Sequence, residues 1–293
     1  VSAVTSYTIL GAADQDETLT VEFSGGNPVP SGGVNYDGGS GGHDTLILTG
    51  GAFHTSTYTY LNAHDGSVAL DPDGPGGTAA SVISYTGLEP VTSSIASDVV
   101  ELVYTGDAEV ITVTDATGGR TTAASTLGET TTFDNPSQRL EIVAASGRDV
   151  INVNSLAAGY ASLVIGGDDV TDTVNFNGPL TFAADQGLTV ADVGTVNLPN
   201  TASDIAAGGT GAVSITALQN IALASGSSIV TADGDITLSA NQQAVPTEGG
   251  PFVGISLTAA TITTTGSGNI SLAGRGGSSG AANHGIRLQS AAA

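Results

Sequence analysis

The sequence contains no cysteine, methionine, tryptophan or lysine among its 293 residues. Without cysteine the chain can form neither a disulfide framework nor a thiolate metal site. Charged residues make up only 11% of the chain, against roughly 25% in an ordinary soluble domain. Because no methionine is present, we expect Val1 to follow a processing site or to begin a module of a longer chain.

Long apolar runs are also missing. No stretch approaches the length of about 18 apolar residues that a membrane helix requires, and no signal-peptide pattern stands at the beginning. We therefore predict no membrane insertion. Strong helix formers other than alanine are scarce, which predicts little helix.

The charge that is present is mostly negative. The formal net charge is −23, from 28 acidic residues against five arginines. Such a field repels nucleic acid, so we predict no nucleic-acid partner, and it attracts divalent cations or a basic partner. All but three acids lie at or before Asp204; the others are Asp233, Asp235 and Glu248. A solubilising role, cation binding and salt adaptation all remain open explanations.

A short repeat unit dominates residues 172–198. Val174, Phe182, Val190 and Leu198 lie eight residues apart, each within a brief apolar and polar alternation that Gly, Asn, Asp or Pro interrupts. A strand of about five residues with a turn of about three produces this spacing. Similar spacing recurs later, at Ile221, Ile229, Ile236, Ile262 and Ile270. The repetition predicts an all-β, right-handed parallel β-solenoid, or β-helix, over residues 93–293.

Residues 1–92 have broader and less regular spacing. Strand-like runs such as TLTVEF and STYTYL are separated by turn clusters such as NYDGGSGGHD and DPDGPGG. This pattern predicts an N-terminal antiparallel β unit that caps the first rung of the solenoid, because an open rung exposes unpaired backbone.

The clearest local motif is DGGSGGHDTLIL, from Asp37 to Leu48. It resembles the calcium-binding nonapeptide of RTX proteins, with one extra residue, His43, before Asp44. Calcium prefers six to eight oxygen ligands and tolerates irregular cages. The aspartates of the Gly-Asp turns are therefore candidate calcium ligands. The alternative is that these turns are purely structural. The candidates are Asp37, Asp44, Asp168, Asp169 and Asp172, with Asp71 and Asp73 as weaker ones.

Catalytic signatures are missing from the sequence. His43–Asp44 and His64–Asp65 are adjacent pairs, but neighbouring residues of a strand point to opposite faces, so adjacency does not make a dyad. There is no Gly-x-Ser-x-Gly elbow, phosphate loop or zinc-spaced histidine pair. A polysaccharide-active β-helix enzyme is therefore the least favoured function, and we predict no enzymatic activity.

The order of motifs resembles the repeat regions of giant bacterial surface proteins, which combine RTX-like Asp-Gly turns with filamentous-haemagglutinin-type β-helix repeats. The resemblance rests on several stretches: NYDGGSGGHDTLILTGG, TYTYLNAHDGSVAL, YTGLEP, GRDVINVNSL, DTVNFNGPLTF, GDITLSANQQA and GNISLAGRGG. It implies an extracellular or cell-surface structural or adhesive role without catalysis, and calcium only where the turns are intact.

We thus expect an extracellular structural module of a surface stalk, adhesin or filament. Self-association would proceed head to tail or by strand exchange, because a contact that does not close generates a fibre. The candidate assembly residues lie near the two ends: Val1, Val4, Tyr7, Ile9, Ile286 and Leu288. The alternative is a calcium-dependent adhesin that binds a glycan or a cell-surface partner. Tyr58 and Tyr60 could line such a site, with core packing as the other explanation.

Overall fold

The computed structural model describes residues 4–78, 80–281 and 283–290. In it, the alternation of apolar and polar residues along the sequence corresponds to an alternation of buried and exposed side chains. In the strand Arg139–Ala144, for example, Leu140, Ile142 and Ala144 are buried and the residues between them are not. Successive side chains of a strand point to opposite faces, so one face of each strand supplies the core.

All regular elements of these described ranges are strands. Accordingly, no helix there is long and apolar enough to cross a bilayer.

The strands form two compact units. One comprises Val1–Glu109 with Ala116–Ala145, and the other comprises Val110–Asp115 with Ser146–Ala293, so β8 (Val110–Thr117) contributes to both. The first unit contains β1 (Tyr7–Leu10), β2 (Thr18–Glu22), β3 (Val34–Asp37), β4 (Thr45–Tyr60), β5 (Gly66–Asp71), β6 (Ser81–Thr86), β7 (Val91–Tyr104), β9 (Arg120–Ser125), β10 (Thr131–Asp134) and β11 (Arg139–Ala144). The second contains β12 (Val150–Val153), β13 (Ser162–Gly166), β14 (Thr173–Phe176), β15 (Leu180–Thr181), β16 (Leu188–Leu198), β17 (Asp204–Ala207), β18 (Val213–Leu223), β19 (Ser228–Thr231), β20 (Ile236–Ala240), β21 (Ile255–Thr258), β22 (Thr261–Thr264), β23 (Ile270–Gly274) and β24 (Ile286–Gln289).

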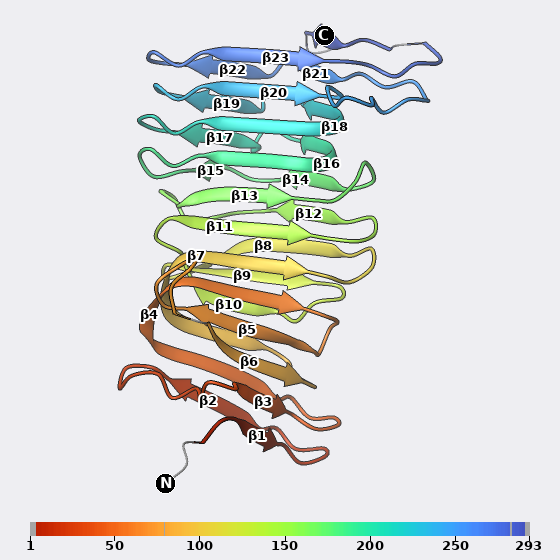
Figure 1. Cartoon of the computed structure of the whole chain (residues 1–293). Coiled ribbons are helices and arrows are strands. Elements are labelled where there is room, and N and C mark those ends of the chain that lie inside the picture. Colours follow the sequence, from red (N-terminus) through yellow and green to blue (C-terminus); the bar gives the residue numbers. More distant parts are fainter. Residues whose placement is uncertain (1–3, 79, 282, 291–293) are drawn as a thin grey trace. The chain divides into compact units, whose positions relative to one another are not determined.

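The strands of the second unit, coloured green to blue in Figure 1, pair mainly in parallel. This pairing aligns the aliphatic side chains of neighbouring strands. Val174 of β14 is in register with Val196 of β16, Val196 with Ile221 of β18, and Ile221 with Ile255 of β21. These partners lie 22, 25 and 34 residues apart in the sequence, and all four are fully buried. Stacked aliphatic rows of this kind form the core of the unit.

The eight-residue spacing does not correspond to one strand per repeat. Val190 and Leu198, which belong to two successive repeats, both lie in the eleven-residue strand β16. The register between β16 and β18 shifts on both sides of Val193, and Gly194 follows directly. A register irregularity bends a strand, so β16 continues through a bend where the sequence predicted a turn.

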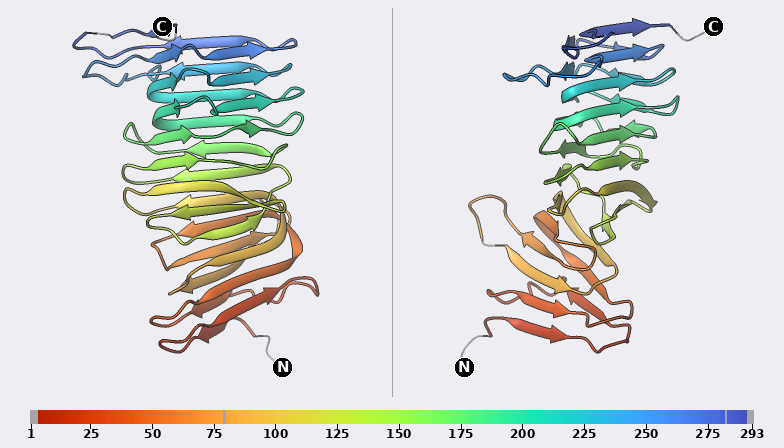
Figure 2. Two further views of the ribbon diagram at one scale, coloured as in Figure 1. Left: turned by 180° about the vertical axis from the view of Figure 1, so that it is seen from behind. Right: turned by 90° about the vertical axis from the view of Figure 1, so that its right-hand side faces the viewer.

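The first unit mixes two strand directions (Figure 2). Strands β1, β3 and β6 pair in parallel, as do β2, β4 and β7. The antiparallel pairs are β4–β5, β5–β6 and β9–β10. The antiparallel N-terminal unit predicted for residues 1–92 is therefore wrong for β1, β2 and β3, which pair in parallel, whereas antiparallel hairpins do join β4, β5 and β6.

The prediction of a right-handed parallel β-solenoid, or β-helix, is also wrong. The main sheet has twenty strands and mixes parallel with antiparallel pairs, and nine of its strands close into a β-barrel. The reason is that apolar periodicity shows which residues face the core. It does not show whether neighbouring strands run in the same direction or whether the sheet closes on itself.

The core of the first unit is aromatic. Tyr60 and Tyr104 stack with ring centroids 4.6 Å apart, and Tyr58 stacks on Phe133 at 6.2 Å. The Tyr60 hydroxyl donates a hydrogen bond to Oγ1 of Thr131 at 2.9 Å. Such a hydrogen bond offsets the burial of a tyrosine hydroxyl, a cost that the aliphatic rows of the second unit do not have.

Candidate functional site

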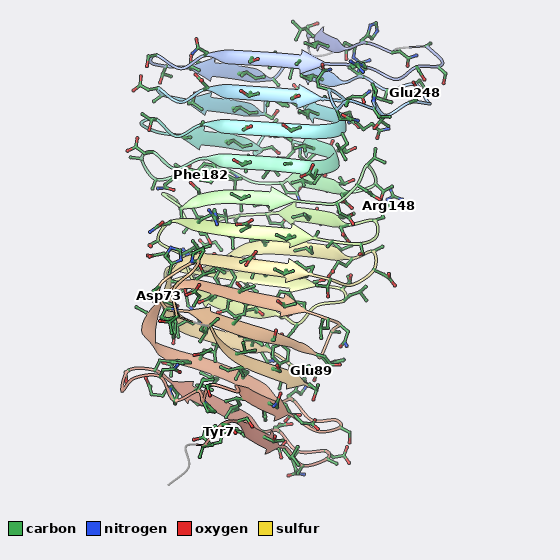
Figure 3. The ribbon with its side chains drawn as sticks, viewed as in Figure 1. Tyr7, Asp73, Glu89, Arg148, Phe182 and Glu248 are labelled. Carbon is green, nitrogen blue, oxygen red and sulfur yellow. The ribbon has the colours of Figure 1, made fainter. Side chains whose placement is uncertain are left out.

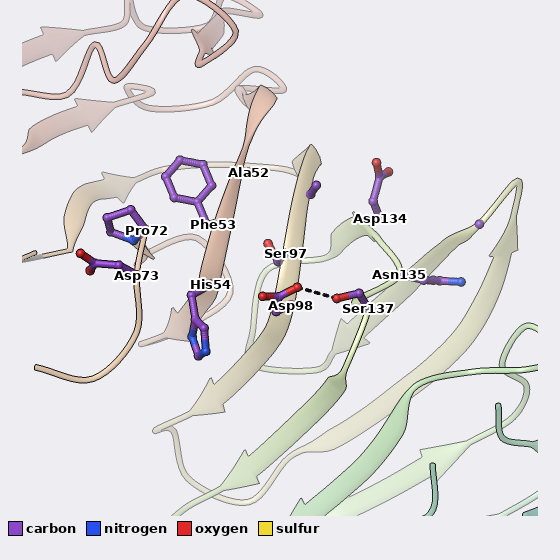
Figure 4. A pocket seen from close by; sticks show the side chains of 12 residues that line it. Ala52, Phe53, His54, Pro72, Asp73, Ser97, Asp98, Asp134, Asn135 and Ser137 are labelled. Atoms are coloured by element: carbon purple, nitrogen blue, oxygen red, sulfur yellow. Dashed lines mark hydrogen bonds between the residues drawn. The ribbon is translucent and has the colours of Figure 1, made fainter. Parts of the chain in front are cut away.

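The first unit carries a cleft of about 590 Å³ beside β4 and β7. Figure 4 shows its lining side chains, which combine a phenyl ring and an imidazole with carboxylates, hydroxyls and an amide. The lining residues are Ala52, Phe53, His54, Pro72, Asp73, Ala96, Ser97, Asp98, Gly119, Asp134, Asn135 and Ser137. We call this hollow the Phe53 cleft.

A bulge in β4 places the aromatic ring. Gly50 and Gly51 both have positive φ, and the register between β4 and β7 shifts between Thr49 and Ala52. Glycine accepts these backbone angles without steric cost. Immediately after the bulge, the Phe53 ring meets the buried Phe23 ring edge to face, with centroids 5.1 Å apart. The ring is thus held from one side and borders the cleft on the other.

The polar groups of the cleft are held by hydrogen bonds. Ser137 donates to Oδ1 of Asp98 at 2.6 Å, as Figure 4 also shows. The Arg120 guanidinium donates to Oδ1 of Asp134 at 3.1 Å and partly neutralises that carboxylate. Fixed acceptors and hydroxyls beside an aromatic face suit a ligand that carries hydroxyl groups, because such a ligand needs both hydrogen bonds and apolar contact.

The predicted aromatic residues Tyr58 and Tyr60 do not line this cleft. Each is only 1% exposed, and both rings pack in the core. Core packing therefore explains them, and the aromatic residue beside the cleft is Phe53. The sequence signal for Phe53 is the Gly50–Gly51 pair, which stands two residues before this aromatic within a strand and indicates a bulge.

The structure brings three candidate calcium ligands together in the loop between β13 and β14. Carboxylate oxygens of Asp168, Asp169 and Asp172 lie within 4.8 Å of one another. Asp172 is 1% exposed, and its Oδ2 accepts the backbone N–H groups of Asp168 and Asp169 at 3.0 and 3.2 Å. Its Oδ1 accepts the N–H of Asp149 at 3.0 Å. Asp172 thus closes the turn, and only Asp168 and Asp169 face outward.

The other aspartate candidates also stabilise turns. Oδ1 of Asp37 accepts the N–H of Gly39, and the buried Asp44 accepts the N–H of Glu17. Oδ1 of Asp71 accepts the N–H groups of Asp73 and Gly74 at 3.1 and 2.9 Å. Asp73 in turn accepts the N–H and the hydroxyl of Thr78. The bonds of Asp37 and Asp71 are those of Asx turns, which need no cation to hold them. Asp44 instead links its loop to Glu17, 27 residues earlier in the chain, and Asp73 closes a loop of five residues.

The candidate assembly residues lie on or beside terminal strands. Val4 is exposed ahead of β1; within β1, Tyr7 is exposed and Ile9 is half-buried. Ile286 and Leu288 of β24 are 41% and 72% exposed. Val1 lies outside the described residues.

Comparisons of the chain with protein-family models, with curated proteins and with solved structures gave no match. The resemblance to giant surface proteins therefore stays a prediction from the sequence. Any assignment of function rests on the geometry described above.

Proposed function

We propose that this chain is a non-catalytic, extracellular structural module that assembles with copies of itself through unpaired strand edges. The observation that carries the proposal is the edge formed by β22, β23 and β24. Among the described residues, β22 pairs only with β19, β23 only with β20 and β24 only with β21. An unpaired edge offers free N–H and C=O groups to another strand.

Apolar side chains accompany this free edge. Ile270 of β23 is 45% exposed, and Ile286 and Leu288 of β24 are exposed as well. Further inside the same rows, Ile236 and Ile255 are fully buried. The edge strands therefore carry the same apolar side chains as the interior strands, but no further strand covers them. A strand from another copy would bury it.

A second free edge lies at the beginning of the chain. Within the described residues, β1 pairs only with β3 and β2 only with β4. Acidic residues surround these strands, whereas residues 205–293 carry three acids and two arginines, a net charge of −1 out of −23. Two acidic edges repel each other, whereas the near-neutral edge meets the acidic edge with little repulsion, which permits head-to-tail contact.

The test is assembly of the full chain as a function of concentration, followed by sedimentation velocity and negative-stain electron microscopy. We expect the wild-type protein to form elongated oligomers, and the double variant Ile270→Asp/Leu288→Asp to remain monomeric. The matched control is Val245→Asp, because Val245 is 84% exposed in the loop between β20 and β21 and belongs to no edge. Circular dichroism establishes that each variant retains its strands.

Two results would contradict this function. One is a wild-type protein that stays monomeric at millimolar concentration. The other is a double variant that assembles as readily as the wild type while Val245→Asp behaves normally.

The Phe53 cleft favours a second candidate function, a glycan-binding adhesin that also binds calcium. Sugars carry hydroxyls on a partly apolar ring, which matches Phe53 beside Asp98, Asn135 and Ser137. Asp168 and Asp169 are the candidate ligands for the calcium ion. A screen of neutral oligosaccharides against the wild type, Phe53→Ala and Asn135→Ala tests the cleft. Leu127→Ala, a surface residue that does not line the cleft, serves as the control. Glycan binding that both cleft variants retain would refute the assignment.

A further inference from the structure

A second hollow of the first unit is formed by β1, β2 and the segment that leads into β3. Its volume is about 250 Å³, and its apolar lining comprises Tyr7, Ile9, Leu19, Val21, Val29 and Val34. Figure 3 labels Tyr7, which is 45% exposed, whereas the three valines are buried. The hollow therefore has a buried apolar floor and an exposed rim. We call it the β1–β2 groove.

Hydrogen bonds fix the segment that closes the groove. Oδ1 of Asn27 accepts the N–H of Val29 at 3.0 Å, and Nδ2 of Asn27 donates to Oγ of Ser81 at 2.7 Å. The N–H of Gly32 donates to the carbonyl of Thr5 at 2.6 Å. A preformed hollow loses little conformational freedom on binding. Since a cavity of about 150 Å³ already accepts a benzene ring, the groove has room for two aliphatic side chains.

The charges around the groove and those around the edge of β22, β23 and β24 have opposite signs. Residues 255–290, which contain this edge, include Arg275 and Arg287 and no acidic residue. Residues 4–45, which form and flank the groove, include no arginine and six acidic residues: Asp14, Asp16, Glu17, Glu22, Asp37 and Asp44. Surfaces of opposite potential attract each other, whereas two copies of either surface repel. The groove thus favours the arginine-bearing edge.

Arg287 of β24 and Glu22 of β2 form no ion pair among the described residues. Nη2 of Arg287 donates a long hydrogen bond of 3.3 Å to Oγ of Ser256, and its Nε is buried without a hydrogen-bond partner in the described part of the chain. Oε1 of Glu22 accepts the N–H of Ser24 at 2.8 Å. This bond holds the pKa of Glu22 below its usual value, so the exposed carboxylate is charged at neutral pH.

The side-chain order of β24 matches that of β2. In β2, Leu19 and Val21 are the more buried residues, and Glu22 is exposed. The two apolar side chains of β24 have the same two-residue spacing, with Arg287 between them. If they lie opposite Leu19 and Val21, the arginine points to the same face as Glu22 and lies diagonal to it, within reach of a long side chain. This relation holds for parallel and for antiparallel addition of β24.

We propose that the β1–β2 groove of one copy binds β24 of a second copy, with Ile286 and Leu288 in the groove and Arg287 paired with Glu22. This inference rests on the function proposed above, and it adds the receiving surface and the ion pair that selects it. Burial of the two aliphatic side chains supplies affinity. The ion pair determines which edges meet.

The experiment is sedimentation equilibrium of charge-reversal variants of the full chain. Glu22→Arg and Arg287→Glu should each weaken self-association at least about tenfold, because like charges then face each other in the contact. An equimolar mixture of the two variants should recover association, since the reversed groove of one then meets the reversed edge of the other. Arg148→Glu, in the exposed loop between β11 and β12, is the control with the same change in net charge as Arg287→Glu. It should associate as the wild type does.

A groove variant tests the apolar part of the contact. Ile9→Asp places a carboxylate in the groove and should also weaken association, while circular dichroism checks that its strands are retained. Wild-type association that the mixture of reversed variants fails to recover, or that Ile9→Asp retains in full, would refute the groove and leave edge assembly standing. Equal loss in Arg148→Glu would assign the effect to net charge alone. A wild type that stays monomeric would contradict both the groove and the function proposed above.

Discussion

The side-chain amide of Asn197 donates a hydrogen bond to Oδ1 of Asn175 at 3.0 Å. Asn175 in turn donates to Oδ1 of Asn152, also at 3.0 Å. The three residues occupy in-register positions of β16, β14 and β12. An asparagine ladder thus crosses three parallel strands, and each amide satisfies the next.

Asn175→Ala removes the central rung of this ladder and leaves the two outer amides without their partner. We expect a loss of about 1–3 kcal/mol in the free energy of unfolding, because half-buried polar groups lose hydrogen bonds. Asn177→Ala is the control, since Asn177 belongs to an exposed pair with Asn154 and should cost less than about 1 kcal/mol. Urea unfolding followed by circular dichroism measures both. Equal losses of unfolding free energy in the two variants would show that the ladder stabilises the fold no more than the exposed pair does.

Ile221 and Ile286 belong to one aliphatic row but differ in burial. Ile221 is fully buried in β18, whereas Ile286 is 41% exposed at the free edge. Ile221→Ala should destabilise the second unit by about 2–5 kcal/mol, because it removes apolar contacts and leaves a cavity. Ile286→Ala should cost much less in the monomer. Thermal unfolding of both variants at the same protein concentration checks the difference, and similar losses would argue against the observed burial.

Gly194 lies at the bend of β16. A Cβ there would overlap the carbonyl oxygen of Val170, which is backbone and cannot rotate away. We therefore expect Gly194→Ala to destabilise the second unit strongly, by more than about 2 kcal/mol. Gly166 in β13 has open space at its Cβ position, so Gly166→Ala should be neutral or stabilising by up to about 1 kcal/mol. The denaturant concentrations at the unfolding midpoints of the two variants and the wild type measure this difference. A tolerated Gly194→Ala would contradict the close approach.

Glu129 makes the first unit sensitive to pH. Burial raises the pKa of this carboxyl to about 8, against the lowering effect of the Thr130 N–H, and the Glu89 charge raises it slightly further. Oε2 of Glu129 is buried and has no hydrogen-bond partner among the described residues. Because the folded form holds the proton up to about pH 8 and the unfolded form loses it near 4.5, the unfolded state binds fewer protons between these values.

The free energy of unfolding of the first unit should therefore fall as pH rises from about 4.5 to about 8, by up to about 4 kcal/mol. Glu129→Gln should flatten this slope, while Glu248→Gln, at an exposed position, should leave it unchanged. Tyrosine fluorescence during urea unfolding reports mainly on the first unit, since Tyr160 is the only tyrosine of the second. A slope that survives in Glu129→Gln would assign the effect to other groups.

Calcium gives a separate prediction for the loop of Asp168 and Asp169. If these carboxylates bind the ion, millimolar CaCl₂ should raise the melting temperature of the wild type, because a ligand that binds only the folded state stabilises it. The double variant Asp168→Asn/Asp169→Asn should lose that rise. Asp71→Asn, in a turn that its own hydrogen bonds close, should keep it. Identical melting curves with calcium and with a chelator would remove calcium from the function.

Much of the strand pattern could be predicted from the sequence. Val174, Phe182, Val190 and Leu198 were singled out by their spacing, and all four are buried. Local alternation suffices for such predictions, because the side-chain period of a strand is fixed by backbone geometry.

The direction and closure of the sheet could not be predicted in the same way. The run TGGR at 117–120 connects β8 to β9, and β9 then pairs antiparallel with β10, although this part of the chain was assigned to parallel rungs. The spacing of apolar residues is the same for both directions. Which strand pairs with which depends on the summed packing of the whole sheet rather than on any one segment.

The candidate sites divide along the same line. The Asp-Gly turns are local, so their residues could be named from the sequence, although their hydrogen bonds are those of self-sufficient turns. The Phe53 cleft and the contact between its residues Asp98 and Ser137 depend on segments that are distant along the chain. The sequence by itself determined where strands and turns form, because backbone geometry acts on neighbouring residues. Only the tertiary structure decided the mixed, closed sheet and the sites between loops, because pairing across the sheet brings distant residues together.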